Sequence, residues 1–174
     1  NDRDMVYAQL IKNVENACIK ARRHHLVAQG LVLFLKQQDF TSVGYEASLS
    51  RASAFPQDMV CITHDLFKKM FKVGIEYRAT GVVLTGLTSD ASVQTSLFEE
   101  PVRLAKLGRV YEALDELADR FGKHTVYLAA SSAAHGTAQH VKERGDVPLR
   151  KQSRVKGETS RQHLTIPFLL NELS

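Results

Sequence analysis

The stretch QGLVLFLKQQDF, Gln29 to Phe40, decides the fold class of this chain. Five consecutive apolar residues follow Gly30, and the run ends in the polar residues Lys36, Gln37 and Gln38. A short apolar run bounded by glycine and by polar residues is typical of a buried β-strand. The stretch therefore predicts a strand that passes through the core and ends at a polar surface.

Two neighbouring stretches predict the strands that pair with it. VGYEASLSR, residues 43–51, alternates between one set of side chains (Tyr45, Ala47 and Leu49) and another that is polar (Glu46, Ser48 and Ser50). This alternation indicates a half-buried strand with one solvent-facing side. IEYRATGVVLTGLT, residues 75–88, is a third strand in which a polar series (Glu76, Arg78 and Thr80) precedes the apolar middle.

Helical periodicity flanks and separates these strands. From Asp2 to about Arg23, apolar residues recur at spacings of three and four, and Asp2 or Asp4 can complement the helix N-terminus. A second helix opens at Pro56 and runs to about Val73, where Gly74 ends it. The order helix, strand, strand, helix, strand predicts an α+β fold, a small antiparallel sheet with two helices packed on one face.

The rest of the chain divides into three segments. We expect residues 1–88 to form the α+β domain and residues 89–101 to form a polar linker. Residues 102–130 predict an extra helix, ended by Gly122, and then a short strand at HTVYLAA. Residues 131–174 are polar, basic and non-periodic, which favours a weakly ordered C-terminal tail.

Composition is that of a globular protein, with 44% hydrophobic and 24% charged residues and a net charge of +4. The sequence has no apolar run of the roughly 20 residues that span a bilayer, nor a signal peptide, so we expect a cytoplasmic protein. The first methionine is Met5, which suggests a piece of a longer protein. Cys18 and Cys61 are each on an apolar helical stripe and predict buried free thiols.

Catalytic motifs are few. The sequence contains neither a Walker A loop nor a GxGxxG fingerprint. His64 and Asp65, with His24 or His25 as a further ligand, leave open a metal-dependent hydrolase of the His-Asp type, although adjacent helical residues point about 100° apart. Ser131 and His135 form a possible pair without a nucleophile elbow around it. We predict no catalytic residue, metal site or cofactor in this chain.

Polar residues of the predicted strands suggest a nucleic-acid surface. Lysine, arginine, hydroxyl and amide groups bind phosphate oxygens, whereas aromatic residues for base stacking are not interleaved among them. These groups fit a sequence-independent grip on a duplex backbone, and an ordinary solvated sheet face fits them equally well. The candidates are Lys36, Gln38, Ser48, Ser50, Arg51, Arg78 and Thr80.

The ordered agreement of several segments resembles a known family. NVENACIKARRHHLVAQGLVLFLKQQDF, the proline-led helix and YRATGVVLTGL are similar to the C-terminal little finger of bacterial Y-family translesion DNA polymerases. QTSLF resembles the sliding-clamp-binding motif of those enzymes, and YEALDELADRFGKHTVYLA is similar to the tail of the SOS mutagenesis branch. The resemblance covers about residues 1–130.

The resemblance implies a DNA-binding domain that grips the primer–template duplex, chiefly through Lys36, Ser50, Arg51 and Arg78. It implies that Gln94, Leu97 and Phe98 bind the sliding clamp, with Thr95 in place of the usual leucine. The Mg²⁺-binding palm carboxylates are absent from this sequence, so we expect no polymerisation by the fragment itself. A recombinase or an accessory SOS subunit is a further possible partner. A stand-alone clamp or nucleic-acid adaptor is the remaining alternative.

Overall fold

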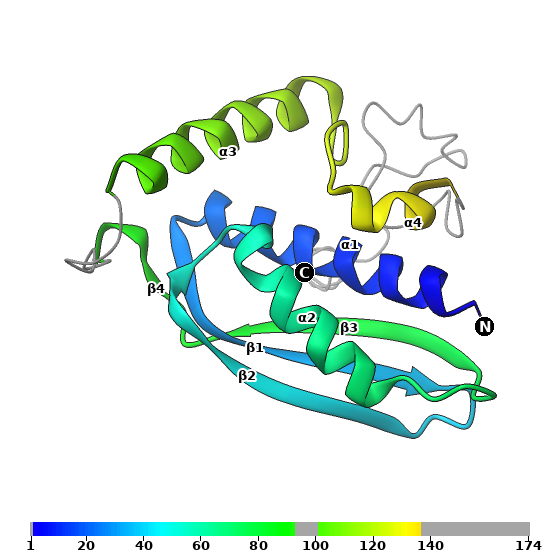
Figure 1. The fold of residues 1–174 in the computed structure, drawn as a ribbon. Coiled ribbons are helices and arrows are strands. Elements are labelled where there is room, and N and C mark those ends of the chain that lie inside the picture. The colour runs from blue at the N-terminus through cyan, green and yellow to red at the C-terminus, as the bar shows by residue number, and fades with distance from the viewer. Residues whose placement is uncertain (1, 93–100, 137–174) are drawn as a thin grey trace, which may run out of the picture.

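The computed structural model describes residues 2–92 and 101–136, and the statements below concern that part of the chain. A four-stranded antiparallel sheet forms one layer, and helices α1 (Arg3–Arg23) and α2 (Pro56–Met70) form the next. A third helix, α3 (Pro101–Phe121), lies beyond α1 on the side away from the sheet (Figure 1). The predicted α+β class, with two helices on one face of the sheet, is confirmed.

Helix α1 begins and ends where its charges favour it. The carboxylate of Asp2 accepts a hydrogen bond from the Asp4 N–H at 3.1 Å, which satisfies one of the donors exposed at a helix start. Lys20, Arg22 and Arg23 stand in the last turn, where cations stabilise the carbonyl end of the helix dipole. The helix predicted over residues 2–23 is therefore correct to within a residue.

The sheet is built around the stretch that predicted it. β1 (Leu26–Gln37) is the central strand and pairs with β2 (Ser42–Ser53) on one side and with β3 (Tyr77–Thr85) on the other. The short β4 (Thr88–Ser89) also pairs with β1, at its beginning. All of these pairings are antiparallel.

Alternate residues of β1 point to opposite faces of the sheet. Leu31, Leu33 and Leu35 are fully buried and pack with α1 and α2 in the main core. Each such leucine contributes roughly 1.5–3 kcal/mol when removed from water. The helices contribute the other half of this core, chiefly Leu10, Val14, Cys18, Met59, Phe67 and Met70.

Helix α2 ends earlier than the sequence predicts. It stops at Met70, and Phe71 is already extended, whereas Gly74 was the expected end. The hydroxyl of Tyr77 explains the difference, because it accepts from the Lys72 N–H at 2.9 Å and donates to the Met70 carbonyl at 3.3 Å. These bonds satisfy backbone groups at the helix end, which the glycine was expected to help do.

The segment after α3 corrects the prediction of a strand at residues 124–130. It consists of turns, a 3₁₀ turn (Ala129–Ser131) and the short helix α4 (Ser132–Gly136). The segment packs on α1, away from any sheet edge, and the Leu128 N–H donates to the Glu15 carboxylate at 2.6 Å. Weak order was expected from residue 131 onward, but Ser131 is fully buried. Residues 137–174 lie outside the described residues.

The two cysteines differ in their surroundings. Cys18 is buried, as predicted, and burial raises the pKa of its thiol to about 12. Cys61 is exposed, which contradicts the expectation of two buried thiols. The buried positions of α2 include Met59, Thr63 and Phe67, and a residue two positions from Met59 lies on the opposite side of the helix. Within the described residues, none of the helices has the length and apolar character needed to span a membrane.

Candidate nucleic-acid interface

The face of the sheet turned away from α1 and α2 is the candidate interface, called here the open face. In Figure 1 none of the described elements covers it. The residues that define it alternate with the core residues of each strand and form cross-strand pairs. They are Gly30, Val32, Phe34 and Lys36 of β1, Ser42, Gly44, Glu46 and Ser48 of β2, and Ala79, Gly81, Val83 and Thr85 of β3.

The centre of the open face is shallow because glycines flank an aromatic ring. Phe34 pairs with Gly44 on one side and with Gly81 on the other. A Cβ atom at Gly81 would collide with the Phe34 ring, so the ring lies across that glycine. An aromatic side chain that covers a strand glycine is a known device for stabilising sheets. The two glycines have no side chains that project from the sheet, so a large ligand could approach the centre of the open face closely.

A cationic cluster lies at one end of the open face, around an exposed aromatic ring. The Arg78 guanidinium carbon is 4.2 Å from the centroid of the Phe40 ring, and Lys36 Nζ is 5.3 Å from the same centroid. Both distances allow cation–π attraction. Phe40 is 65% exposed, so its ring holds two positive charges together at the surface. We call Lys36, Phe40 and Arg78 the cationic tip.

The turn that presents Phe40 is fixed by local hydrogen bonds. Asp39 Oδ1 accepts from the Thr41 hydroxyl at 2.7 Å and from the Thr41 N–H at 3.0 Å. Both bonds hold the pKa of the Asp39 carboxyl below its usual value, and the bond from the Thr41 hydroxyl has the larger effect. Phe40 itself has a left-handed backbone (φ 71°), which is uncommon for a bulky residue. The turn therefore holds its aromatic side chain in a defined, strained position.

An irregularity in the pairing of β1 with β3 places Arg78 beside this turn. Lys36 pairs with Ala79, but the next residue, Gln37, pairs with Tyr77. Arg78 is thus left out of the regular register, as in a β-bulge, while Tyr77 is buried in the core. Bulges often redirect a side chain, and here the exposed one is the arginine.

The predicted DNA-binding residues do not all share one face. Lys36 and Ser48 lie on the open face, Ser50 is exposed further along β2, and Gln38 is exposed in the turn. Arg78 joins Lys36 through Phe40. The other two predicted residues, Arg51 and Thr80, face the helices.

Arg51 forms an ion pair with the start of α2. Its guanidinium lies 2.7 Å from Asp58 Oδ2, and both side chains are less than one quarter exposed. The same oxygen accepts from the Ser53 hydroxyl at 2.5 Å. This network ties the end of β2 to the first turn of α2, so the structure gives Arg51 a role in the fold.

Thr80 points toward α1. Asn13 Nδ2 donates to the Thr80 hydroxyl at 2.8 Å and to its carbonyl at 2.9 Å. The expectation that Thr80 shares a polar face with Arg78 is wrong, because the bulge at Arg78 changes the alternation between them.

Sequence reasoning also missed one member of this surface. It predicted no aromatic residue among the polar groups, but Phe40 lies between Lys36 and Arg78. The signal was present in the turn sequence Asp39-Phe40-Thr41, since aspartate commonly forms such hydrogen-bonded turns. Glu46 brings a negative charge to the open face, opposite Val32. The predicted clamp-binding residues Gln94, Leu97 and Phe98 lie outside the described residues.

The catalytic alternatives gain no support from the geometry. His64 makes an edge contact with Tyr7, at 5.6 Å between ring centroids, and Asp65 is exposed. Among the described residues, neither belongs to a cluster of three metal-binding side chains, nor do His24 and His25. Ser131 Oγ lies 3.2 Å from His135 Nε2, but the serine is fully buried and donates to the Leu128 carbonyl. A substrate could not reach that hydroxyl.

By its fold, this protein is a small α+β domain whose sheet has one face covered by helices and one open face. The family is more specific. Residues 1–97, more than half of the chain, match the model of the impB/mucB/samB family C-terminal domain, so the chain belongs to that family. It is therefore a C-terminal domain of the Y-family DNA polymerase type, as the sequence resemblance implied.

Curated relatives agree with this assignment. The chain is 26% identical over 108 residues to "DNA polymerase IV" of Acetivibrio thermocellus and 26% identical over 136 residues to "DNA polymerase IV" of Pelotomaculum thermopropionicum. It is 28% identical over 132 residues to "DNA polymerase IV 2" of Bacillus subtilis. The matches cover 62%, 78% and 74% of this chain, but only 27%, 32% and 31% of the respective relatives.

Proposed function

We propose that this chain is the duplex-gripping part of a translesion DNA polymerase, with the open face turned toward the primer–template. The observation that carries the proposal is the cationic tip, in which Phe40 holds Lys36 and Arg78 together at the surface. Family membership and the net charge of +4 support it. Nucleotidyl transfer with Mg²⁺ by the whole polymerase belongs to the same proposal.

The chemistry of the tip favours the phosphate backbone over base edges. Lysine and arginine side chains bind phosphates and release counterions, which makes the affinity depend on salt and little on sequence. The shallow centre around Phe34 and its glycines would let the duplex approach the sheet closely. Ser48 and Ser50 would add hydroxyl donors further along β2, since both are exposed. Such a surface holds DNA without selecting its sequence.

Fluorescence anisotropy with labelled primer–template duplexes tests this grip. Arg78→Ala should weaken binding about tenfold, the loss expected for one hydrogen bond to a charged group. The weakening should be similar on unrelated sequences, and the slope of log affinity against log salt should fall by about 1. Unchanged affinity in Arg78→Ala, or a strong preference of the unaltered chain for one sequence, contradicts the proposal.

Lys69→Ala supplies the matched control. Lys69 is an exposed cation on α2, on the opposite side of the sheet layer. The Lys69→Ala substitution changes the net charge as much as Arg78→Ala does, so a general charge effect would weaken DNA binding equally in both variants. The proposal requires the Lys69→Ala variant to bind nearly as tightly as the unaltered chain.

We also propose that Gln94, Leu97 and Phe98 bind a sliding clamp, on the ground of the QTSLF motif alone. Burial of the two apolar side chains gives roughly 3–6 kcal/mol before the costs of ordering, so a micromolar or weaker affinity is expected. The double variant Leu97→Ala with Phe98→Ala should lose clamp binding in a titration and keep its DNA affinity. Retained clamp binding in that variant contradicts the motif assignment.

A further inference from the structure

A second cluster of chemically active side chains lies on the other side of the molecule, where the segment after α3 meets α1. Glu15 of α1, His124 just after α3 and His135 of α4 each offer one ligand atom, and these atoms lie within 4.8 Å of one another. More than 100 residues separate Glu15 from either histidine in the sequence. Only the docking of this segment on α1 brings them together.

Glu15 is the unusual member of the cluster. Glu15 is only 5% exposed, and burial raises the pKa of its carboxyl. Oε1 accepts from the Leu128 N–H at 2.6 Å, but Oε2 is buried without a hydrogen-bond partner. The Ser131 hydroxyl donates to the Leu128 carbonyl at 2.9 Å and lies 3.2 Å from His135 Nε2. Its closeness to Glu15 lowers the pKa of the carboxyl, but burial has the larger effect. A buried carboxylate oxygen without a partner is costly and requires an explanation.

The histidines are positioned as ligands would be. His135 Nε2 lies 4.0 Å from Glu15 Oε2, and the ring stacks on Tyr127 with 4.1 Å between centroids. His124 Nε2 lies 3.1 Å from Asn16 Oδ1, an outer partner of the kind that orients metal-bound histidines. The positive charge of Lys12 acts on both Glu15 and His135, and its ammonium donates to the Ala134 carbonyl at 3.3 Å.

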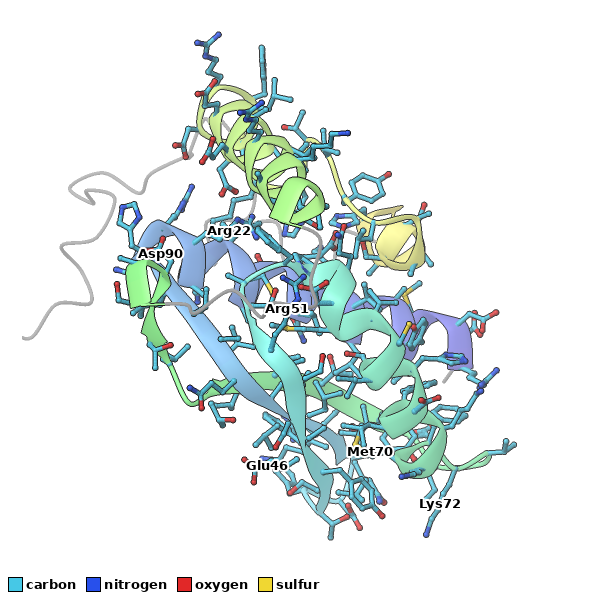
Figure 2. The ribbon with its side chains drawn as sticks, turned by 60° about the vertical axis from the view of Figure 1, so that its left-hand side comes forward. Arg22, Glu46, Arg51, Met70, Lys72 and Asp90 are labelled. Carbon is cyan, nitrogen blue, oxygen red and sulfur yellow. The ribbon has the colours of Figure 1, made fainter. Side chains whose placement is uncertain are left out.

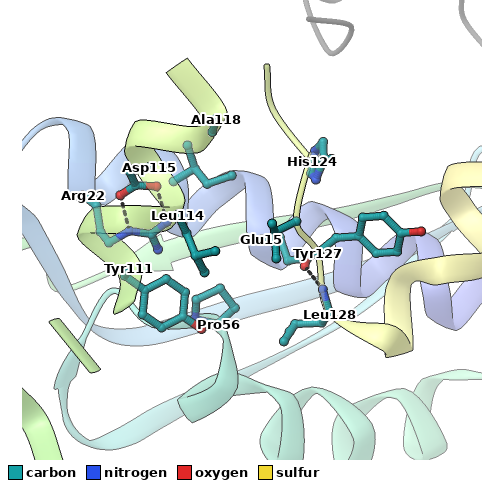
Figure 3. Close-up of a pocket in the computed structure, with 12 residues that line it drawn as sticks. Glu15, Arg22, Pro56, Tyr111, Leu114, Asp115, Ala118, His124, Tyr127 and Leu128 are labelled. Carbon is teal, nitrogen blue, oxygen red and sulfur yellow. Dashed lines mark hydrogen bonds and ion pairs between the residues drawn. The ribbon is translucent and has the colours of Figure 1, made fainter. Parts of the chain in front are cut away.

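We propose that Glu15, His124 and His135 bind a divalent transition-metal ion of the Zn²⁺ type, which fastens residues 122–136 to α1. Two imidazoles and one carboxylate form a recognised ligand set for zinc, with a fourth position left for water or another ligand. Glu15 and His124 line the pocket between α1, α3 and the following segment (Figure 3), so that fourth position would face the pocket. The ion would give Glu15 Oε2 its missing partner. This inference does not depend on the proposed DNA grip.

The test begins with the full chain freed of metal by a chelator. Zinc chloride alone is then added, and binding is measured by competition with a chromophoric chelator. We expect one equivalent to bind per chain, and saturating zinc to raise the thermal midpoint by roughly 5 °C. Co²⁺ in place of zinc should give the intense visible absorption of a four-coordinate site, a readout that needs no variant. Absence of stoichiometric binding, or only the weak absorption of hydrated cobalt, overturns the proposal.

Two variants locate the ion. Glu15→Gln keeps an oxygen that can accept from the Leu128 N–H, but it removes the carboxylate, and His135→Gln removes one imidazole. Each should weaken zinc binding at least ~10-fold and abolish the zinc-dependent rise of the midpoint. His64→Gln is the matched control and should keep both. Zinc affinity that is unchanged in Glu15→Gln and His135→Gln would place the metal elsewhere in the chain and overturn the proposal.

Discussion

The two faces of the sheet are built from the same strands, yet one is covered by helices and the other is open. On β1, Leu31, Leu33 and Leu35 point to the helices and are fully buried, whereas the alternate residues Val32 and Phe34 point to the open face and are half-buried. The neighbouring strand β2 shows the same contrast, because Arg51 lies near α2 whereas Glu46 lies on the open face, opposite Val32 (Figure 2). One face stabilises the fold, which leaves the other free to carry a binding surface.

The largest expected effect concerns the helix-covered face. Leu33→Ala leaves a cavity in the core and should lower the free energy of unfolding by about 2–5 kcal/mol. Val32→Ala, one residue away on the open face, should cost no more than about 1 kcal/mol because Val32 is only half-buried. Urea unfolding followed by circular dichroism measures both. Equal losses in the two variants would mean that the faces do not differ as described.

The next effect tests how α3 is attached to the helix-covered side. Arg22 forms a double ion pair with Asp115, at 2.7 Å for each oxygen, and its guanidinium carbon lies 4.6 Å from the centroid of the Tyr111 ring (Figure 3). Asp115→Ala leaves the largely buried arginine without its carboxylate and should cost about 1–3 kcal/mol in unfolding free energy.

Asp119→Ala is the control for that prediction. Asp119 pairs with Arg23 at 2.8 Å, but its side chain is 70% exposed. Exposed ion pairs contribute about 0–1 kcal/mol. Denaturant titrations of the two aspartate variants should therefore differ clearly, and an equal cost would show that burial of the Arg22 pair is unimportant.

A smaller effect is expected on the open face. Glu46 places a negative charge where phosphates are proposed to lie, so Glu46→Gln should raise duplex affinity about threefold, the effect of one unit charge at roughly 6 Å in water. Anisotropy titrations at low salt measure the change, which should shrink as salt is added. Weaker binding in Glu46→Gln would mean that DNA does not lie over this part of the sheet.

The smallest effect concerns the thiols. Burial raises the pKa of Cys18 to about 12, so this thiol stays protonated and unreactive at neutral pH in the folded chain. A thiol reagent should modify only Cys61 until the protein is unfolded, and modification of Cys61 should leave the thermal midpoint unchanged because that side chain is exposed. Mass spectrometry counts the modified thiols. Rapid modification of Cys18 in the native protein would contradict the described core.

Local sequence patterns predicted the class of fold because they act within an element. The apolar run after Gly30, the alternation in residues 43–51 and the proline at the start of α2 each depend on neighbours a few positions away. The errors arose where a side chain outside the predicted element makes a hydrogen bond that local periodicity does not show. Tyr77 ends α2 before Gly74, and Glu15 holds residues 124–130 against α1 instead of at a sheet edge.

The candidate sites show the same division. Residue order and spacing were enough to predict the family, the central strand and the two cations Lys36 and Arg78. The three-dimensional fold was needed to show that Phe40 contacts those cations, that Arg51 and Thr80 face the helices, and that Glu15 lies beside His124 and His135. A β-bulge in the pairing of β1 with β3 places Arg78 beside Phe40, and the docking of residues 122–136 on α1 brings Glu15 to the histidines. Both are long-range events, which strand alternation and helical periodicity do not encode.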